Sequence, residues 1–515
     1  MTKQYDNYAD LITFSRSSSG TALRPVSYGD ELVTNGTFDT DTSGWTLSSG
    51  GTHTVSSGEL TIDRDGDLAV IPYITQGIST VVGNLYLLSF EVKAGSTFSY
   101  SVSLDGVEVI TPTSVTTGTK TLTFVATETT TDVALFSRNS IASVLVLDNI
   151  SVKEVLFDQP NAPLTLFNHP AGIPRIEYDA DGNRLGLLIE ESRTNLITYS
   201  EDFSNAAWGP WASGATIVDN ALTGPDGTLS MSSITPATSS SGIIEFFPVS
   251  SGADYTLSVF AKVTSGEETN VTLLLYQGVV LVVVVFEFVD GVPSLSSGSG
   301  SIEDFGNGIY RLSMTITTAS ASNHAMGILS TKPYYAFGAQ VEAGAFPTSY
   351  IPTSGATATR AADVASIPVS AFGYNQSEGT VVVEASTAST TQTNHTDLRI
   401  KDGSSLPLVS SGSRVGGSSE GTYSLYSPST TILVNVSSVV TEGSTYKSAY
   451  RLADNDVAIS VNGSTVATDT SVSFTSLIAE AVEIGDGYGY LNGHIKSIKY
   501  YPRRLTNAQL QELTT

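Results

Sequence analysis

The stretch GIPRIEYDADGNRLGLLIEESRTNLITYSEDF (residues 172–203) carries the pattern that decides the fold. Its turn residues, Asp-Ala-Asp-Gly-Asn at 179–183, separate two short segments, and turns favour these residue types. After the turn, every second residue from Leu185 to Ile189 is apolar, which is the alternation of a half-buried strand. These features predict a β-hairpin followed by an extended connector. Because one face of the hairpin is apolar, we expect it to pack against another part of the chain.

The acidic residues of this stretch allow two other interpretations. Asp179, Asp181 and Asn183, with Glu190 further on, spell most of an EF-hand calcium loop. However, the glycine comes one position too early, and strands rather than helices flank the turn. Glu190 and Glu191 could instead form a carboxylate pair for glycoside hydrolysis, although no spacing places such a pair across a cleft. We favour a hairpin turn and an acidic pair at a strand end, neutralised by a nearby arginine.

Length and composition limit the classes of protein. At roughly 150 residues per domain, the 515 residues suggest about three domains. The formal net charge of −26 argues against a nucleic-acid partner, because little in the chain would neutralise phosphates, while an acidic surface could attract calcium. The chain contains no cysteine, which excludes disulfides and thiol catalysis.

Apolar runs in the chain are short. The N-terminus lacks the apolar core of a signal peptide, and the run at 279–286 is too short to span a bilayer. We therefore expect no membrane insertion and no Sec-type export of the chain's own. Because residues 279–289 are almost entirely apolar, we also expect them to form a strand buried on both faces.

Three segments resemble a widespread group of bacteriophage tail and fibre proteins. PRIEYD…GNRLGLLIEESRTNL resembles the linker motif that joins β-sandwich modules in that group. TFSRSSSGTALRPVSYG (13–29) resembles the segment that opens those proteins, and TSYIPTSG…TRAAD (348–363) resembles their hinge. The resemblance implies a virion protein whose leader and linker belong to one connector unit. We therefore predict that residues 13–29 pack against residues 172–198 despite their distance in the sequence.

Repeated strand patterns predict duplicated β-sandwiches. Three segments of the first module have similar counterparts, in the same order, in the second. They are VTNGTFDTDTSGW with YSEDFSNAAW, LYLLSFEVKAG with DYTLSVFAKVTSG, and VLVLDNISVKE with YYAFGAQVEAG. The segments resemble carbohydrate-binding jelly-roll modules, in which the first and last strands often bracket a structural calcium. That resemblance places calcium ligands on Asn35, Asp39 and Asp148, whereas the second copy has Gln340 in place of Asp148. The alternative is a turn at Asn35 and a surface carboxylate at Asp148.

The C-terminal part resembles a concanavalin/laminin-G-like lectin sandwich. The segments EGTVVVEAS, TYKSAYRLADNDVAISVNGSTVAT and GYLNGHIKSIKYYPRRLTNAQLQELT carry that resemblance. Thr506 followed by Gln509 spells a capping box for a short terminal helix. The predicted fold class is all-β and multi-domain, with two jelly-roll β-sandwiches, a C-terminal concanavalin A-like β-sandwich and that helix. The predicted divisions are a leader or virion-docking segment (1–30), a first jelly-roll module (31–155), a β-hairpin connector (156–198), a second jelly-roll module (199–353), a linker (354–368) and a lectin-like domain (369–515).

Sugar binding is the chemistry that the sequence supports best. Aromatic rings stack on the faces of sugars while carboxylates and amides reach the hydroxyl groups. The candidate carbohydrate-binding residues are Trp211 in the second module and Asp486, Tyr488 and Tyr490 in the DGYGY loop of the third.

No catalytic pattern stands out. GSSEG around Ser419 has the spelling of a nucleophile elbow, but it lies in a Gly/Ser-rich loop rather than between a strand and a helix. The five histidines are scattered, with no metal-binding pair among them. Trp45 and Trp208 occupy the same position in the two repeats, which is typical of core residues. We therefore predict no catalytic residues and no enzymatic activity.

Together, these inferences predict a non-enzymatic phage virion protein, either a tail fibre or a tail-associated adhesin, that binds host-surface glycans. Its expected partners are host glycans and other virion proteins, and its expected location is the particle surface. The resemblance implies a homotrimer, although the sequence has no coiled-coil heptads. The alternatives are a structural spacer or a head or tail decoration protein that binds other virion proteins, a polysaccharide depolymerase, and a secreted bacterial adhesin, which the missing export signal disfavours.

Overall fold

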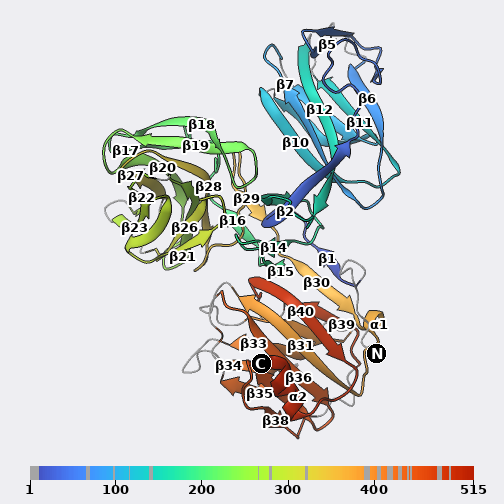
Figure 1. Ribbon diagram of the computed structural model, residues 1–515, viewed down its shortest axis with the longest axis vertical. Helices are drawn as coiled ribbons and strands as arrows, with labels where there is room; N and C mark the ends of the chain where they lie inside the picture. The colour runs from blue at the N-terminus through green and yellow to red at the C-terminus, as the bar shows by residue number, and fades with distance from the viewer. Residues whose placement is uncertain are drawn as a thin grey trace. The chain divides into compact units, whose positions relative to one another are not determined.

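The protein is built almost entirely of antiparallel strands, as the computed structural model shows (Figure 1). The prediction of a multi-domain all-β fold is confirmed. Contacts divide the chain into two compact units, Pro25–Pro163 and the combination of Met1–Arg24 with Leu164–Thr515. The structure describes residues 11–64, 70–96, 99–114, 116–138, 143–264, 266–277, 281–318, 323–387, 395–402, 407–414, 422–426, 432–437, 440, 443–472, 478–486 and 489–515.

The smaller unit is a β-sandwich. One sheet is centred on β12, which pairs with β2, β5 and β7. Besides β13, described below, its strands are β10 (Gly118–Val125), β7 (Leu85–Val92), β12 (Ser143–Phe157), β2 (Gly20–Glu31), β5 (Glu59–Arg64) and β4 (Thr52–Ser56). The facing sheet contains, in order, β3 (Thr46–Leu47), β6 (Tyr73–Ser79), β11 (Thr130–Arg138), β8 (Ser99–Leu104) and β9 (Val107–Ser114). Alternate residues of these strands fill the core between the sheets, as in β7, where Leu88, Phe90 and Val92 are buried.

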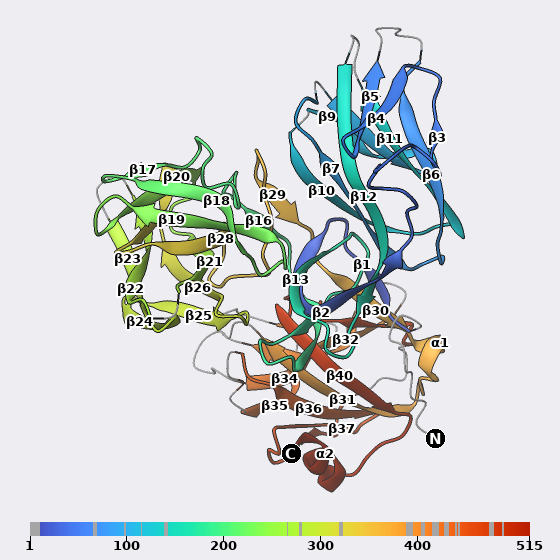
Figure 2. The ribbon, with the colours of Figure 1, turned by 45° about the horizontal axis from the view of Figure 1, so that its top comes forward.

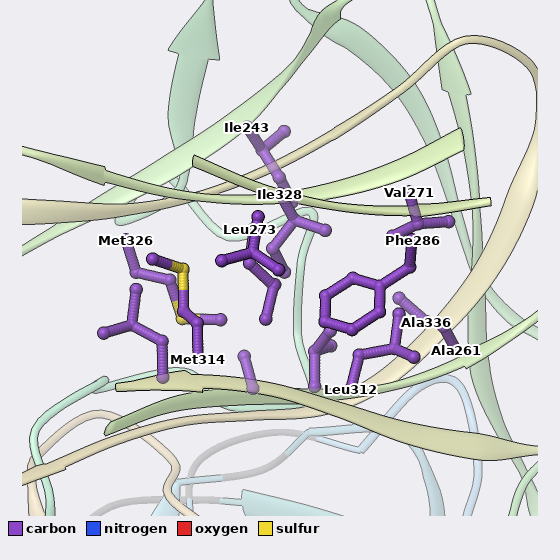
Figure 3. Close-up of a cluster of buried hydrophobic side chains, with 14 of the residues drawn as sticks. Ile243, Ala261, Val271, Leu273, Phe286, Leu312, Met314, Met326, Ile328 and Ala336 are labelled. Carbon is purple, nitrogen blue, oxygen red and sulfur yellow. The ribbon is translucent and has the colours of Figure 1, made fainter. Parts of the chain in front are cut away.

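The larger unit contains a second sandwich. Its first sheet has the order β17 (Gly209–Trp211), β20 (Ser241–Pro248), β27 (Asn323–Ser330), β22 (Thr269–Tyr276), β23 (Leu281–Val289) and β24 (Val292–Ser297). Its other sheet has the order β18 (Ala215–Thr223), β19 (Leu229–Pro236), β28 (Tyr334–Ala343), β21 (Asp254–Lys262), β26 (Tyr310–Thr317) and β25 (Gly300–Asp304). Figure 3 shows Leu273 and Ile328 of one sheet meeting Leu312 and Met314 of the other in the buried layer between them.

A third sandwich completes the larger unit, and strands from outside the C-terminal third extend both of its sheets. One sheet has the order β14 (Ile176–Tyr178), β15 (Arg184–Ile189), β40 (Gly493–Tyr501), β31 (Glu378–Thr387), β36 (Tyr446–Ala453), β37 (Val457–Val461) and β38 (Ala467–Asp469). The other has the order β1 (Thr13–Ser15), β30 (Val364–Pro368), β39 (Ala481–Ile484), β32 (Leu398–Lys401), β33 (Pro407–Arg414), β34 (Thr422–Tyr426) and β35 (Ile432–Ser437). Among the described residues of this unit, β13 (Leu164–His169) is the strand after β2 in the order of its sheet, and β16 (Arg193–Asn195) pairs with β29 (Ala358–Arg360).

The predicted hairpin forms as β14 and β15. Its turn is fixed by Asp179, whose Oδ1 accepts hydrogen bonds from the backbone N–H groups of Asp181 (3.0 Å) and Asn183 (2.8 Å). The carboxylate therefore supports the turn by hydrogen bonding, as expected of a hairpin rather than a calcium loop. The partner of the apolar face is the C-terminal sandwich, because β15 pairs with β40 and Ile189 joins the core of that sandwich.

The predicted contact between the leader and the linker motif is confirmed. The backbone N–H of Gly172 donates to the carbonyl of Arg16 at 2.9 Å, and Arg175 Nη1 donates to the carbonyl of Thr21 at 3.1 Å. Arg16 Nη2 also donates to the carbonyl of Ile173 at 3.3 Å.

The two repeats share contacts that explain their common pattern. Trp45 is 8 % exposed and donates its indole N–H to Asn35 O at 3.0 Å; Trp208 is 6 % exposed and donates to Tyr199 O at 2.8 Å. Each indole also packs against a phenylalanine a few residues before it. The prediction that both tryptophans are core residues is confirmed, and these equivalent contacts support a duplicated module.

The expected strand buried on both faces is wrong. In β23, Val284 and Phe286 point into the core, whereas Leu281 and Val283 are 51 % and 41 % exposed. The strand lies next to the outermost strand of its sheet, β24, and only its inward face meets the opposite sheet. Composition alone did not reveal this, because the outward residues are as apolar as the inward ones.

Two helices occur in the described residues, α1 (Val369–Phe372) and α2 (Asn507–Thr514). The capping box of α2 is confirmed: Thr506 Oγ1 accepts from the N–H of Gln509, and the Gln509 side chain accepts from the N–H of Thr506. Leu510 anchors the helix on the C-terminal sandwich, at the end that Figure 2 shows beside β37. Neither helix is long and apolar enough to cross a membrane.

Candidate functional site: a buried ion-pair network and the cavity beside it

The residues that carry the phage-like motifs converge on one buried network. Asp363, from the TRAAD segment, accepts a hydrogen bond from Arg16 Nη1 at 3.0 Å and another from Arg175 Nη2. Its Oδ2 also accepts the backbone N–H of Glu190 at 3.0 Å. Asp363 and Arg175 are fully buried and Arg16 is 3 % exposed, so the leader, the hairpin and the hinge are joined by charges shielded from water.

Glu190 is the second centre of this network. Its Oε2 accepts from Arg360 Nη1 at 2.6 Å and lies 2.8 Å from Arg175 Nη1, while Ser349 donates its N–H (2.7 Å) and hydroxyl (2.6 Å) to the carboxylate. Burial raises the pKa of Glu190, but the attraction of Arg360 and Arg175 and the hydrogen bonds from Ser349 outweigh it. The pKa therefore lies well below its usual range, and the carboxylate stays ionised.

A network of this kind costs free energy unless every charge is paired. Removing an ion from water costs several kcal/mol, which is on the order of the free energy gained from attraction to its partner charges. Here each of the two carboxylates is held by two arginines, and Arg360 Nη2 also donates to the carbonyl of Glu191 at 2.6 Å. A planar guanidinium group donates its hydrogen bonds only in fixed directions, so the network fixes the relative orientation of the segments that it joins. We call the set Arg16, Arg175, Glu190, Arg360 and Asp363 the joint.

The connector after the hairpin is tied down in the same way. Asn195 is fully buried; its Nδ2 donates to the carbonyls of Ala339 (3.1 Å) and Ile351 (2.9 Å), and its Oδ1 accepts the N–H of Val341 at 3.1 Å. Arg193 forms an ion pair with Glu191 at 2.5 Å. The SRTNL part of the motif therefore acts as a structural clamp on the second sandwich.

A cavity of about 480 Å³ lies beside the joint within the larger unit. The hairpin contributes Glu177 and Glu190 to its wall, the second sandwich contributes Glu303 and Arg311, and the C-terminal sandwich contributes His494. A volume of this size is typical of sites for small ligands. The wall also carries hydroxyl groups and aromatic rings, from Ser301, Thr348, Phe305 and Phe346.

The carboxylates of the cavity differ in their state. Glu177 is paired with His494, with 2.7 Å between Oε2 and Nε2. Glu303 lies opposite Arg311 in the pairing of β25 with β26 and makes no hydrogen bond with a described residue. Desolvation by the surrounding protein, with the negative charges of Glu177 and Glu190, raises the pKa of Glu303 to about 7 against the opposing effect of Arg311 and His494. Glu303 keeps exposed surface because it faces the hollow.

Asn492 supplies an unpartnered donor at the same wall. The residue is 1 % exposed, and its Oδ1 accepts the N–H of Glu191 at 2.9 Å. Its Nδ2 has no hydrogen-bond partner among the residues that the structure describes. Buried N–H groups without a partner are rare and costly, so one at a cavity wall marks a position that a ligand or water would satisfy.

The predicted sugar-binding residues lie elsewhere. Trp211, on β17, is half-buried against Tyr276, with ring centroids 5.5 Å apart. Asp486 and Tyr490 are half-buried in the C-terminal sandwich. Burial raises the pKa of Tyr490, and the negative charge of Asp486 raises it further. Tyr488 and Ser419 lie outside the described residues. None of the described candidates lines the cavity, and their role in sugar binding stays a prediction.

The predicted calcium ligands are engaged in local contacts. Asn35 Nδ2 donates to the carbonyls of Asp41 (2.9 Å) and Ser43 (3.1 Å), and Asp39 is exposed. Asp148 accepts the N–H of Asn149 at 2.7 Å and lies 3.8 Å from Lys93. No group of three or more His, Asp or Glu side chains arranged for a metal occurs in the part of the chain that the structure describes. Calcium binding stays a prediction.

Sequence reasoning missed the residues that meet in the cavity. Glu177 stands in the PRIEYD motif and His494 in the closing NGHI segment, but nothing local signals that they pair across 317 positions. Glu303 and Arg311 face each other across two neighbouring strands, and a correct pairing of 300–304 with 310–317 would have found them. Asn492 carries no signal of its own.

Comparison with known proteins gives likenesses of low identity. No family model matches the sequence, and neither does any curated protein sequence. Among solved structures, the chain is similar to the N-terminal CBM22-1–CBM22-2 tandem domain of Paenibacillus barcinonensis Xyn10C, with a TM-score of 0.21 and 13 % identity over 61 % of this chain and 98 % of that one. It is also similar to Trypanosoma rangeli sialidase, with a TM-score of 0.25 and 10 % identity over 96 % of this chain and 93 % of that one.

The sialidase likeness corrects one prediction from the sequence. The chain was expected to be non-enzymatic, yet several structures that it matches at high probability are those of an enzyme. The prediction that the chain has no enzymatic activity is therefore wrong. TM-scores of 0.25 and below assign neither an activity nor a domain arrangement to this chain.

Proposed function

We propose that the chain is a bacteriophage attachment protein, part of a tail fibre or associated with the tail, that binds glycans on the host surface. The observation that carries the proposal is the joint. The three segments that resemble phage tail proteins supply all of its charged residues: Arg16, Arg175, Glu190, Arg360 and Asp363.

The joint supports this function because attachment requires binding modules in a fixed relation to one another. Ser349, from the end of the second sandwich, and Glu190, from the end of a strand that extends the C-terminal sandwich, are hydrogen-bonded directly. A flexible linker would leave the two sandwiches free to reorient, whereas buried charge pairs hold one geometry. On a homotrimeric fibre, such rigid modules would present three equivalent weak sites and gain avidity.

The test is binding of the full-length protein, fluorescently labelled, to a panel of bacterial strains before and after periodate oxidation of their surface glycans. We expect at least one strain to bind the protein and to lose most of that binding on oxidation. Binding that oxidation leaves unchanged on every strain would refute glycan recognition and favour a spacer or decoration protein. Release of reducing ends from the strain's polysaccharide would instead indicate a depolymerase.

A further inference from the structure

We propose that the cavity beside the joint binds a neutral sugar, one or two rings in size, and rejects acidic sugars. This inference rests on the proposed function and names the site and the ligand class. The volume of about 480 Å³ suits a ligand of this size.

Two polar groups at the wall are available to a ligand. Asn492 Nδ2 is buried, and neither this amide nor the carboxyl group of Glu303 makes a hydrogen bond with a described residue. Sugar hydroxyl groups both donate and accept, so one ring can satisfy an amide N–H and a carboxylate together. Because the pKa of Glu303 lies at about 7, the carboxyl group can donate or accept near neutral pH.

Aromatic side chains form the apolar part of the wall. Phe305 packs edge-on against Phe260 with ring centroids 4.8 Å apart, and both line the cavity with Phe346. All three are buried against the second sandwich, so their positions are set before a ligand arrives. A wall that combines aromatic carbon with a few directed polar groups is typical of small-ligand sites.

The charges of the wall select against acidic sugars. Three carboxylates, Glu177, Glu190 and Glu303, line the cavity together with the cationic Arg311 and the imidazole of His494. Arg311 is already engaged, because its Nη1 donates to Thr348 O at 2.6 Å and its Nη2 to Ser258 Oγ at 2.9 Å. A sialic acid or uronic acid would bring a further carboxylate to this wall without a free guanidinium fork to receive it.

The test uses the full-length protein and soluble sugars. Binding of methyl glucoside, methyl galactoside, methyl mannoside and N-acetylglucosamine would be measured by saturation-transfer NMR and calorimetry at about pH 8, where a carboxyl group of pKa about 7 is mostly ionised. Glucuronic acid and N-acetylneuraminic acid are the acidic probes. We expect at least one neutral sugar to bind, and both acidic sugars to bind at least tenfold more weakly.

Variants at Glu303 locate the site. Glu303→Gln should weaken binding of the neutral sugar about tenfold, because it removes one charge-assisted hydrogen bond. Glu303→Lys should weaken it further and narrow the difference between neutral and acidic sugars. Glu287→Gln, an exposed glutamate on β23 of the same sandwich, is the matched control and should change nothing. Because Glu303 makes no side-chain hydrogen bond within the described part of the chain, both variants should keep the melting temperature of the parent protein within a few degrees or raise it.

The outcomes separate this inference from the proposed function. Sugar binding that both Glu303 variants leave unchanged would place the site elsewhere and overturn the inference while attachment stands. Equal affinity for neutral and acidic sugars would overturn the selectivity. If no sugar binds but glycan-dependent attachment to cells persists, the cavity proposal alone falls. If attachment is also absent, both fall.

Discussion

Replacing Asp363 by asparagine should open the joint. The substitution preserves the shape of the side chain but removes the charge that faces Arg16 and Arg175. Arg175 keeps its ion pair with Glu190, whereas Arg16 loses its ion pair with Asp363. Breaking a buried ion pair by removing one partner costs about 3–5 kcal/mol. Asp363 also accepts the N–H of Glu190, and asparagine can keep that bond through its own oxygen. We therefore expect a loss of about 3–5 kcal/mol in the free energy of opening, with the separate sandwiches still folded.

Hydrogen exchange followed by mass spectrometry measures this loss where it occurs. Since 1.4 kcal/mol is about tenfold in an equilibrium constant, exchange in peptides covering 172–198 and 345–366 should accelerate by roughly a hundredfold to a few thousandfold. Peptides from Pro25–Pro163 form a separate compact unit and serve as an internal reference. Asp290→Asn is the matched control, because Asp290 is exposed in the turn between β23 and β24 at a positive φ of 52°, which asparagine tolerates.

Two results would refute this reasoning. Exchange in the joint peptides that accelerates less than about tenfold in Asp363→Asn would mean that the buried charges contribute little to holding the segments together. An equal effect in Asp290→Asn would mean that the change is not specific to the joint. Acceleration spread evenly through the second sandwich would show instead that the substitution unfolds the module.

Four further predictions follow from particular contacts. The pKa of Glu190 in the folded protein lies far below its unfolded value of about 4.3, so its charge stabilises the fold above that pH and this contribution is lost as the pH falls. Glu190→Gln should therefore lower the melting temperature at pH 7, and the melting temperature of the variant should fall less steeply between about pH 5 and 3. Glu303 has the opposite sign, because desolvation and the negative charges of Glu177 and Glu190 raise its pKa against the opposing effect of Arg311 and His494. Stability should therefore fall as the pH rises from about 4.5 to 7, so Glu303→Gln should raise the melting temperature at pH 8, and no gain there would contradict the shift. Gly186→Ala should cost more than about 1 kcal/mol, because φ is +135° and a Cβ would lie 2.4 Å from Ile495 O, and slow exchange persisting in 184–189 would argue against it. Thr506→Ala should cost about 1 kcal/mol in exchange protection of α2, whereas Thr506→Ser should keep it.

Local patterns predicted local structure well. The hairpin, the capping box at Thr506 and the buried Trp45 and Trp208 each depend on residues within about ten positions, where spacing and residue type decide the outcome. The exposed face of β23 was mispredicted because its exposure is not decided by local residue types. Its sequence is apolar on both faces, and only the position of the strand near the sheet edge distinguishes them.

The sites were harder to predict because their residues come from distant segments. Asp363 meets Arg16 across 347 positions and Arg175 across 188, and no spacing rule connects them. The resemblance of the segments to phage proteins predicted that the leader and the hairpin meet, but not which charges pair. The cavity was missed because it exists only where the hairpin and two sandwiches come together, and the aromatic residues favoured from sequence are held within single sandwiches.

The joint and the cavity depend on each other through Glu190. Its carboxylate is held by Arg175, Arg360 and Ser349 and at the same time lines the cavity, so the charge that fixes the segments also contributes to the field around Glu303. A purely apolar joint could be as stable, because replacing buried ion pairs by well-packed apolar side chains is often neutral. It would, however, lack the directional hydrogen bonds that fix Ser349 beside the cavity and the fixed negative charge that opposes acidic ligands. The charged joint thus connects the relative placement of two sandwiches with the electrostatics of the cavity between them.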